Sequence, residues 1–474
     1  MRQVLAAEFA TELDHLAELA VRSVAAGDEL AVLEMAIRQA MTALGGQVLA
    51  ALLATDTGHT GPAVDCGSGG HSGGHSGGHS GGHSGGHSGG HRAGFVGYRT
   101  KKFDTVLGPI SLRRAYYHCA TCQAGVVPRD EQLGVSGASL SPGLRAMTAH
   151  AAAALPFGKA TALLNEFTGL ALAEHRIERA AEADGAILAA LTTAEAEAIT
   201  AHRLSPLPRP SGELPDKLYI ETDGTGVPMR ADQVESRAGK APDGRARTRE
   251  IKLGCLFTQT RCDDDGRPVA DPGSASYVAT FQDSQAFGTL LAAEARRRGA
   301  DHIRQLVVIG DGAKWIWTQA NTHFPEATQI VDLYHAREHL HDLADHLAFI
   351  VEDQRLWREQ RLADLDNGDI AAIVDAARVY PLTGSKKDEL DTKLGYFETN
   401  AHRMTYAHFR ELGLFVGSGA VEGACKSLIG QRLKQAGMRW NLSGAHAISE
   451  LRCLDASGRW HELWPKIHNQ TRTA

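Results

Sequence analysis

The alternation of apolar and polar positions over residues 216–464 predicts an α/β domain. Five short apolar runs in this stretch have the composition of strands. They cover residues 218–223, 251–258, 277–281, 306–311 and 328–333. The first three runs follow one another directly, whereas helical patterns separate the later ones. Three strands in series, followed by alternating helices and strands, predict a mixed sheet with helices on its faces.

This β-β-β-α-β-α-β-α succession is that of a ribonuclease H-like mixed sheet, with three antiparallel strands before the alternation of helix and strand. In that order the first and fourth strands are neighbours. We therefore expect Asp223 and Asp311, which end these two strands, to lie side by side. Residues from about 335 to 410 are charged and helical, and they predict a helical insertion. Glu422 follows the insertion, where a run of small residues opens another helical pattern.

Asp223, Asp311 and Glu422 are candidate metal ligands. Their hard carboxylate oxygens suit Mg²⁺ or Mn²⁺ better than sulfur or imidazole does. Two such ions serve phosphodiester hydrolysis, because one activates the attacking oxygen and the other stabilises the leaving oxygen. The three carboxylates thus predict a two-metal catalytic site. Glu221 lies two residues before Asp223, on the same face of the strand, and is a candidate helper.

The N-terminal part of the chain predicts a helical region and a linker. Residues 1–60 carry a helical pattern that breaks near residues 26–28, which predicts a helical hairpin. Residues 67–91 repeat His-Ser-Gly-Gly, so that a histidine recurs every fourth residue. So much glycine cannot hold a helix, and the repeat predicts a flexible low-complexity linker.

Residues 92–135 predict a zinc-ribbon-like β region. Apolar residues alternate on either side of a Gly-Pro turn, and Cys119-Ala-Thr-Cys122 follows the second strand. A C-x-x-C after a strand is half of a zinc ribbon. Cys66 and a histidine of the repeat, such as His71, are candidates for the other ligands. The spacing fits either a Zn²⁺ site or a metal-free knuckle.

Two regions are candidates for contacts with DNA. Within the helical residues 141–203, a helix, a turn at 168–169 and a second helix over 170–183 resemble a helix-turn-helix. There Arg176 and Arg179 are the candidate contacts, although three glutamates of the second helix weaken the case. The second region is the basic run after Glu422, which comprises Lys426, Arg432, Lys434, Arg439 and Trp440. A solvated helix face explains this run equally well. A Pro-rich linker over 204–215 precedes the α/β domain.

Composition sets broad limits on the function. Of the 474 residues, 43% are hydrophobic and 22% charged, as in soluble globular proteins. The net charge of −7 argues against a uniformly basic nucleic-acid binder but leaves room for local basic faces. Seven cysteines, an odd number, predict reduced thiols. No signal peptide or membrane-spanning run is expected, so we predict a cytoplasmic protein without a membrane partner.

Five motifs carry a family resemblance: DGTGVPM, GDGAKWIW, IVDLYHAREHL, GSGAVEGACKSLIGQRLKQAGMRW and GAHAISELRCLDASGRWHELW. From about residue 95 to the C-terminus the chain resembles transposases of the ISKra group of bacterial insertion sequences, which belong to the DDE, ribonuclease H-like superfamily. The resemblance implies that Asp223, Asp311 and Glu422 form the metal-binding triad. It also implies that Asp332 and His335 match an accessory D-x-x-H motif. The His-Ser-Gly-Gly repeat departs from the family, since a C-x-C-type zinc half-site usually stands there.

The implied activity is DNA transposition, in which the element's ends are cleaved and joined to target DNA. The expected partners are double-stranded DNA, as terminal inverted repeats and as target, and further copies of the chain in a homodimer or larger oligomer. Two alternatives remain. One is a DNA-binding protein that no longer cleaves. The other is a zinc metallopeptidase, because His335, Glu338 and His339 also fit an H-x-x-E-H motif.

Overall fold

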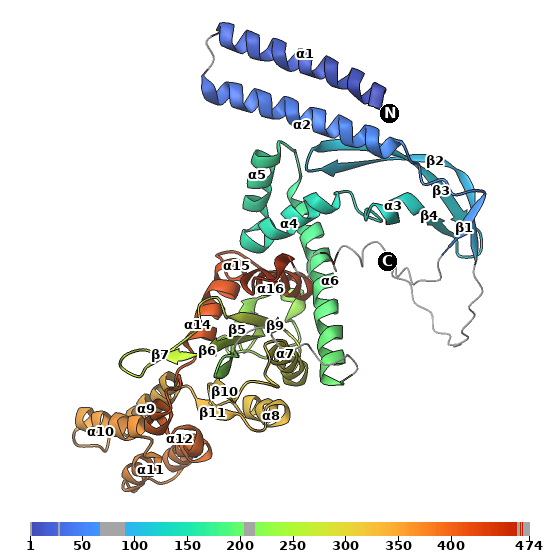
Figure 1. The fold of residues 1–474 in the computed structure, drawn as a ribbon. Coiled ribbons are helices and arrows are strands. Elements are labelled where there is room, and N and C mark those ends of the chain that lie inside the picture. The colour runs from blue at the N-terminus through green and yellow to red at the C-terminus, as the bar shows by residue number, and fades with distance from the viewer. Residues whose placement is uncertain are drawn as a thin grey trace. The chain divides into compact units, whose positions relative to one another are not determined.

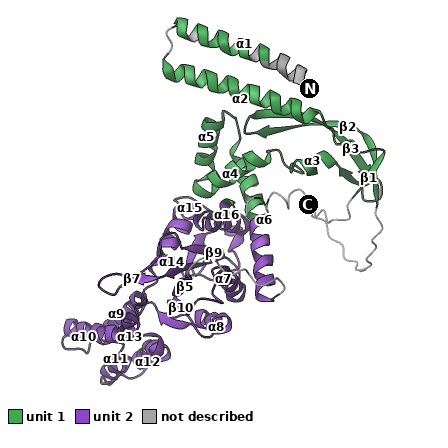
Figure 2. Cartoon of the chain, in the orientation of Figure 1, with its two compact units in different colours: residues 1–187, 461–474 green, residues 188–460 purple. Residues whose placement is uncertain are grey.

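The computed structural model describes residues 2–26, 29–66, 91–202 and 214–461, together with residues 465 and 467. The chain divides into two compact units, residues 1–187 with 461–474 and residues 188–460 (Figure 2). Most of the His-Ser-Gly-Gly repeat, including His71, and most of the Pro-rich linker lie outside the described residues.

The first unit begins with two helices, α1 (Arg2–Ala26) and α2 (Leu30–Ala54), which confirm the break expected near residues 26–28. Of the described helices, α2 alone is long and apolar enough to cross a membrane by length and composition, which is weak evidence for a membrane span. Near its C-terminal end, Leu49, Ala50 and Leu53 pack against a buried cluster on the neighbouring sheet.

That sheet has four antiparallel strands in the order β1-β2-β3-β4 (Figure 1). They are β1 (Ala63–Asp65), β2 (Arg92–Thr105), β3 (Gly108–Cys119) and β4 (Ala124–Val126). The expected hairpin is confirmed, since β2 and β3 are joined at a turn that ends on Gly108. Gly108 has a φ of +100°, a conformation that favours glycine. A short helix, α3 (Pro128–Gln132), follows β4.

Three helices complete the first unit: α4 (Pro142–Ala154), α5 (Phe157–Thr168) and α6 (Glu174–Thr200). The turn expected at residues 168–169 is present, because Gly169 ends α5 with a φ of +72°. The second helix differs from the expected 170–183. It begins at Glu174 and runs to Thr200, beyond the boundary between the units at residue 187. Its buried Asp184 pairs with Arg145 of α4 and thus fixes α6 within the core.

The second unit holds a five-stranded mixed sheet in the order β11-β10-β5-β6-β9. Its strands are β5 (Lys217–Pro228), β6 (Thr248–Gln259), β9 (Ser276–Thr280), β10 (Gln305–Gly310) and β11 (Thr328–Val331). β5, β6 and β9 pair antiparallel, whereas β5, β10 and β11 pair parallel. The predicted mixed α/β sheet is confirmed, and so is the adjacency of its first and fourth strands. β7 (Arg261–Cys262) and β8 (Pro268–Val269) form a separate two-stranded ribbon.

One boundary in this sheet differs from the expectation. Asp223 does not end β5 but lies within it, because β5 stays paired with β6 as far as Pro228 opposite Thr248. Asp-Gly is a common turn pair, but the long antiparallel partner keeps residues 223–224 extended. Asp311, by contrast, follows the last residue of β10 as expected.

Helices cover both faces of the central strands. Glu221 of β5 accepts a hydrogen bond from the backbone N–H of Val421 in α14 (Gly419–Ala424), so α14 lies on the face to which Glu221 and Asp223 point. The opposite face carries α7 (Ser284–Arg297). There Gly254 allows close packing, since a Cβ at this position would lie 2.4 Å from the Leu291 side chain of α7. Helix α8 (Lys314–His323) connects β10 to β11.

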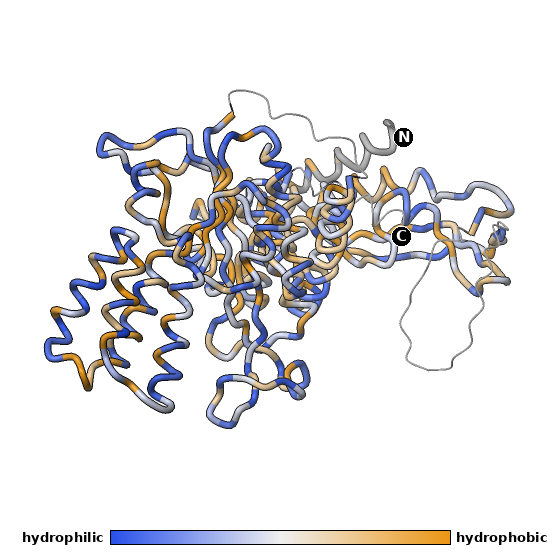
Figure 3. Tube along the Cα trace, turned by 90° about the horizontal axis from the view of Figure 1, so that it is seen from below, coloured by the Kyte–Doolittle hydropathy of each residue, from blue (hydrophilic) through white to orange (hydrophobic). Residues whose placement is uncertain are grey.

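The expected helical insertion follows β11 and contains only helices. They are α9 (Leu333–Leu347), α10 (Gln354–Asn367), α11 (Ile370–Arg378), α12 (Ser385–Asn400), η2 (Ala401–Arg403) and α13 (Tyr406–Glu411). Figure 3 shows hydrophobic and hydrophilic residues alternating along these helices. Leu340, Leu343 and Leu347 of α9 are buried, as are Leu390 and Leu394 of α12. The insertion therefore has its own apolar core.

After α14 the chain continues as a π-helical turn, η3 (Cys425–Gly430), then α15 (Gln431–Leu433) and α16 (Leu442–Ala456). A 3-10 turn, η1 (Ala231–Gln233), follows β5. π-helical turns are rare and are often found at functional sites. Here the turn begins three residues after Glu422, so the helical stretch that carries this carboxylate is irregular where it meets the sheet.

Candidate functional site

A polar cavity of about 640 Å³ lies in the second unit between the sheet and the segment that follows the insertion. Its lining includes Asp223, His335, Glu338, Glu422, Lys426 and Lys434. Asp223 and Glu422 are 199 positions apart in the chain, yet they line the same cavity. It lies at the carboxyl ends of the parallel strands, which is where open α/β sheets commonly bind ligands.

Asp311 approaches this region from the adjacent strand. In the parallel pair β10 and β5, the last paired residues are Ile309 and Glu221, and each lies two positions before its candidate aspartate, Asp311 or Asp223. The Asp311 carboxylate accepts a hydrogen bond of 2.8 Å from the backbone N–H of Ala313, which fixes the turn after β10. Asp311 is half-buried. Its turn therefore holds the carboxylate at the strand end that the sequence predicted.

The insertion supports the same turn. The Tyr396 hydroxyl of α12 donates a hydrogen bond of 3.1 Å to the backbone carbonyl of Asp311. The Tyr396 ring also packs against Gly312, which has a φ of +97°. A Cβ at this position would lie 2.7 Å from the ring, so only glycine fits both the backbone conformation and the space. No motif in the sequence indicates this contact, because it joins residues 85 positions apart.

Asp332 fixes two segments around the cavity. It is fully buried and directly follows β11. One of its carboxylate oxygens accepts a 2.8 Å hydrogen bond from the backbone N–H of His335 and caps α9. The other oxygen accepts a hydrogen bond from the backbone N–H of Ser418, just before α14. These bonds lower the pKa of Asp332, against the effect of its burial, and keep it ionised. Asp332 therefore positions both His335 and the segment that carries Glu422.

His335 lies beside this carboxylate and is expected to be cationic at neutral pH. Its Nδ1 is 3.3 Å from the Asp332 oxygen, and the hydrogen bond between them raises the pKa of His335 to about 9. Ligand atoms of Asp332, His335 and Glu422 lie within 4.8 Å of one another, close enough to share a cation. Asp223, Asp311 and Glu422 do not form so tight a group among the described residues. A histidine binds metal only when it is neutral, so a proton and a metal ion would compete for His335.

Glu221 has a structural position. It is almost fully buried, and its carboxylate accepts a 2.9 Å hydrogen bond from the backbone N–H of Val421 in the first turn of α14. Burial raises the pKa of Glu221 to about 8, and the nearby Asp332 and Glu422 carboxylates add to that shift. Glu221 lies on the same face of β5 as Asp223, as predicted, and it ties β5 to the helix that carries Glu422.

The basic run after Glu422 divides into exposed and buried residues. Lys426, Lys434 and Arg439 are exposed, and the first two line the cavity. Lys426 lies 3.9 Å from Glu422, and Lys434 donates a hydrogen bond to the Thr225 hydroxyl. Arg432 and Trp440 are only 1% and 7% exposed, so the DNA contacts expected of them are wrong. Arg432 is buried within α15, whereas Trp440 lies after that helix, in an isolated bridge with Met229, and its indole N–H donates to the Leu433 carbonyl.

His339 of the H-x-x-E-H motif does not point to a metal shared with His335. Its ring stacks on Tyr396 at a centroid distance of 3.7 Å. Within the described residues, the group that could hold a metal joins His335 to Asp332 and Glu422 instead. This arrangement does not favour the metallopeptidase alternative.

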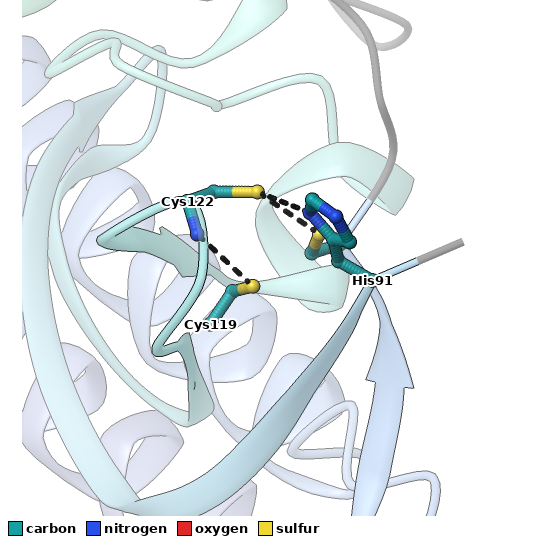
Figure 4. A group of neighbouring side chains, drawn as sticks. His91, Cys119 and Cys122 are labelled. Atoms are coloured by element: carbon teal, nitrogen blue, oxygen red, sulfur yellow. Dashed lines mark hydrogen bonds between the residues drawn. The ribbon is translucent and has the colours of Figure 1, made fainter. Parts of the chain in front are cut away.

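A second group of candidate ligands lies in the first unit. The ligand atoms of Cys66, His91, Cys119 and Cys122 are all within 4.8 Å of one another. Figure 4 shows the side chains of His91, Cys119 and Cys122 converging. The Sγ atoms of Cys66 and Cys122 are 3.6 Å apart, and the Nδ1 of His91 is 3.0 Å from the Cys122 Sγ. Three of the four residues were predicted. The histidine is His91, the last of the repeat, while the predicted His71 lies outside the described residues.

The electrostatics and the packing around these sulfur atoms both favour binding of a metal cation. Hydrogen bonds, chiefly from the backbone N–H of Cys122, lower the pKa of Cys119 to about 7. Burial and the neighbouring thiols raise the pKa of Cys66 to about 12. The core beneath is small and consists of Ala93, Ala115 and Tyr117 together with Cys119 itself. Small domains with little core commonly rely on a structural metal.

The residues expected to read DNA in the helix-turn-helix-like region differ in exposure. Arg176 is half-buried and lies 2.7 Å from the Asp104 carboxylate, and it also donates to Ser139. These contacts hold its guanidinium within the first unit. Arg179 is exposed.

Comparison with known protein families matches part of the chain. Residues 295–464 match the model of an uncharacterised protein family, UPF0236. The matched stretch is shorter than half of the chain; it includes Asp311, Asp332 and Glu422 but not Asp223. None of the curated proteins matches the chain.

Proposed function

We propose that the chain is a DDE transposase of the ISKra type that cleaves and joins DNA at its carboxylate site, on a ribonuclease H-like sheet. The observation that carries the proposal is the convergence of Asp223 and Glu422 on one open cavity, with Asp311 following the adjacent parallel strand. The strand order β11-β10-β5-β6-β9 and the insertion before Glu422 agree with this assignment.

The donor set suits hard divalent cations. Asp223, Asp311 and Glu422 would hold Mg²⁺ or Mn²⁺ through oxygen. When bound, two such ions supply activation of the attacking oxygen and stabilisation of the leaving one. Lys426 and Lys434, exposed at the cavity, would hold the phosphates of the DNA strand. Asp332 would keep His335 oriented toward Glu422, with its positive charge beside the incoming phosphate.

The chemistry follows from this arrangement in two steps. Water attacks the scissile phosphorus, the P–O bond to the 3′ oxygen breaks, and that oxygen takes up a proton to leave a 3′-hydroxyl. The 3′-hydroxyl then attacks a phosphorus of target DNA and displaces a second 3′-hydroxyl, so that one phosphodiester replaces another. No bond to the protein forms. The expected partners are duplex DNA and a second copy of the chain.

Nicking of a duplex that carries the terminal inverted repeat tests the proposal. We expect Mg²⁺-dependent nicking to fall at least about a thousandfold in Asp223→Asn and Glu422→Gln, while duplex affinity stays within a few-fold. Glu326→Gln, an exposed carboxylate away from the cavity, is the matched control and should nick normally. Full nicking by Asp223→Asn would refute the assignment. Hydrolysis of a peptide that depends on His339 but not on Asp311 would favour a peptidase instead.

We also propose that the sulfur cluster binds Zn²⁺. Zinc takes four Cys and His ligands in tetrahedral structural sites, at about 2.3 Å from sulfur, which sets ligand atoms about 3.8 Å apart. The 3.6 Å between Cys66 and Cys122 and the four-residue donor set agree with that geometry.

A further inference from the structure

The hairpin of β2 and β3 is far more basic than the rest of the chain. Between Arg92 and Cys119 it carries six Arg or Lys residues and a single acid, Asp104, in a protein with a net charge of −7. Asp104 is already paired with Arg176. Lys101 and Arg114 share the Asp130 carboxylate. The remaining excess of positive charge is therefore concentrated on the hairpin's exposed side chains.

Four of these six cations are exposed and have no acidic partner among the described residues; Arg92 donates to the backbone carbonyl of Ala63, which leaves three others. Arg99, Lys102 and Arg113 are exposed, and no ion pair involves them within the described parts of the chain. Lys102 lies opposite Ser111 and Arg113 opposite Thr100 in the β2–β3 register, so their side chains share one face of the ribbon. Ser111 and Thr100 are exposed there as well. We call Tyr98, Thr100, Lys102, Ser111 and Arg113 the basic hairpin face.

Tyrosines hold two of the guanidinium groups flat. The Arg113 guanidinium lies 3.9 Å from the ring centroid of Tyr98, and that of Arg99 lies 3.4 Å from the ring centroid of Tyr116. A stacked guanidinium keeps its N–H donors in its own plane, where they point away from the ring and remain available to phosphate oxygens. Stacking also limits the side-chain entropy that binding would remove. The arginines are thus positioned to hold phosphates.

The shape of the hairpin determines which kind of nucleic-acid duplex it fits. β1 pairs only with residues 92–94 and β4 only with residues 117–119, so the segment between them is a two-stranded ribbon. Its other face is packed on α2 through Phe103, Ile110 and Leu112. A two-stranded ribbon fits the major groove of B-form DNA, which is about 12 Å wide, whereas the major groove of an RNA helix is too narrow.

We propose that the basic hairpin face, together with the exposed Arg99, which lies opposite Arg114 on the other face of the ribbon, is a second DNA-binding surface that holds the phosphates of a DNA duplex on either side of its major groove. The inference rests on the proposed function, because it takes DNA to be the substrate. It adds the place in the first unit where that DNA would be bound. It assigns DNA binding to residues other than Arg176 and Arg179.

The test is the salt dependence of duplex binding by the full-length chain. A 30-base-pair duplex is titrated by fluorescence anisotropy at several salt concentrations. In the triple variant Arg99→Gln, Lys102→Gln, Arg113→Gln, we expect the slope of log Kd against log salt to fall by about 3, because each phosphate contact contributes about 0.9. Affinity at 0.1 M salt should fall about tenfold or more.

A matched variant removes the same charge elsewhere. Arg267, Arg355 and Lys387 are exposed in the second unit, and each pairs with an acid. Their triple replacement by Gln should leave the slope and affinity nearly unchanged. Arg99→Lys with Arg113→Lys keeps the charge but loses the planar stacking, so it should retain the slope with weaker affinity. Equal losses in both Gln triples, or no loss in the hairpin triple, would overturn the inference.

Further measurements distinguish a failure of this inference from a failure of the proposed function. They also distinguish DNA from other anionic partners. If Asp223→Asn still nicks DNA but the hairpin triple loses affinity, the proposed function fails and the inference stands. If nicking depends on Asp223 but the hairpin triple binds normally, the inference alone fails. Binding of duplex RNA or of phosphatidylserine vesicles as tightly as DNA, through the same three residues, would overturn the choice of partner. An unchanged thermal midpoint in the triple excludes unfolding as the cause of lost affinity.

Discussion

The two candidate metal sites differ in how tightly their ligands are drawn together. In the first unit, four sulfur and nitrogen atoms lie within 4.8 Å of one another above a small core. In the second unit, carboxylates from separate strands and a helix border an open cavity of about 640 Å³. Structural metal sites are closed by their ligands, whereas catalytic sites leave positions for substrate and water. The difference agrees with our proposals of a structural role for the first site and a catalytic role for the second.

Loss of the sulfur cluster should give the largest effect on stability. Cys122→Ser removes the residue that contacts both Cys66 and His91. We expect the bound zinc to fall from one equivalent to nearly none, and the first unit to lose several kcal/mol, since structural zinc supplies about 10–16 kcal/mol in small domains. Metal analysis of the purified protein and thermal unfolding with and without a chelator measure both effects.

The control for this prediction is Cys262→Ser, which changes an exposed cysteine outside the cluster. It should keep both the metal and the thermal midpoint. If Cys122→Ser retains a full equivalent of zinc, then the cluster is not the site, and the contrast between a closed and an open site fails.

A substitution at Gly312 tests whether the open site depends on its supports. Gly312→Ala places a methyl group 2.7 Å from Tyr396 at a φ of +97°. We expect a loss of about 1–3 kcal/mol in stability and a larger loss in nicking, because the turn that holds Asp311 must move. The double variant Gly312→Ala, Tyr396→Phe should not recover, since the ring remains. Tyr396→Ala in the same background should recover part of the stability by removing the collision. Wild-type nicking by Gly312→Ala would show that the Asp311 turn is not needed.

The sequence predicted the second unit better than the first, for a physical reason. Strands of a mixed sheet buried on both faces are nearly continuous apolar runs, as in residues 306–309, so their order and the adjacency of the strands that carry Asp223 and Asp311 follow from pattern alone. The hydrogen bond of Tyr396 to the Asp311 turn, and that of Glu221 to α14, join residues 85 and 200 positions apart and leave no local signal.

The predictions were wrong where residues of one regular sequence pattern are partly buried and partly exposed. The spacing of the basic run gave no means of telling the buried Arg432 from the exposed Lys434, because burial depends on what packs against each side of the helix. The fourth sulfur-cluster ligand was similarly ambiguous, since the histidines of the repeat are each preceded by Ser-Gly-Gly and only His91 is followed by a different residue, Arg92. The structure distinguishes His91 because it directly precedes β2, which pairs with the strand next to Cys66.

The smallest expected effect is a pH dependence of opposite sign at the two sites. The folded-state pKa of His335 is about 9, above its ordinary value of 6.5, so its protonated form stabilises the fold below about pH 6.5. This contribution is lost as the pH rises through 9. It should amount to about 1 kcal/mol, because the pair is partly exposed to solvent. The folded-state pKa of Cys119 is about 7, below its ordinary value of 9, so its contribution is lost as the pH falls through 7.

Thermal midpoints measured between pH 6 and pH 9.5 separate the two contributions. His335→Gln should lose the decline that wild-type protein shows toward high pH, because glutamine carries no charge to titrate beside Asp332. In protein freed of zinc by a chelator, Cys119→Ser should instead lose the decline toward low pH. His346→Gln, which removes a histidine that lies 3.6 Å from Glu389 in the insertion, is the control for a general histidine effect. If His335→Gln declines toward high pH as steeply as the wild type, then the Asp332–His335 pair does not hold the proton, and His335 is free to bind a metal ion with Glu422.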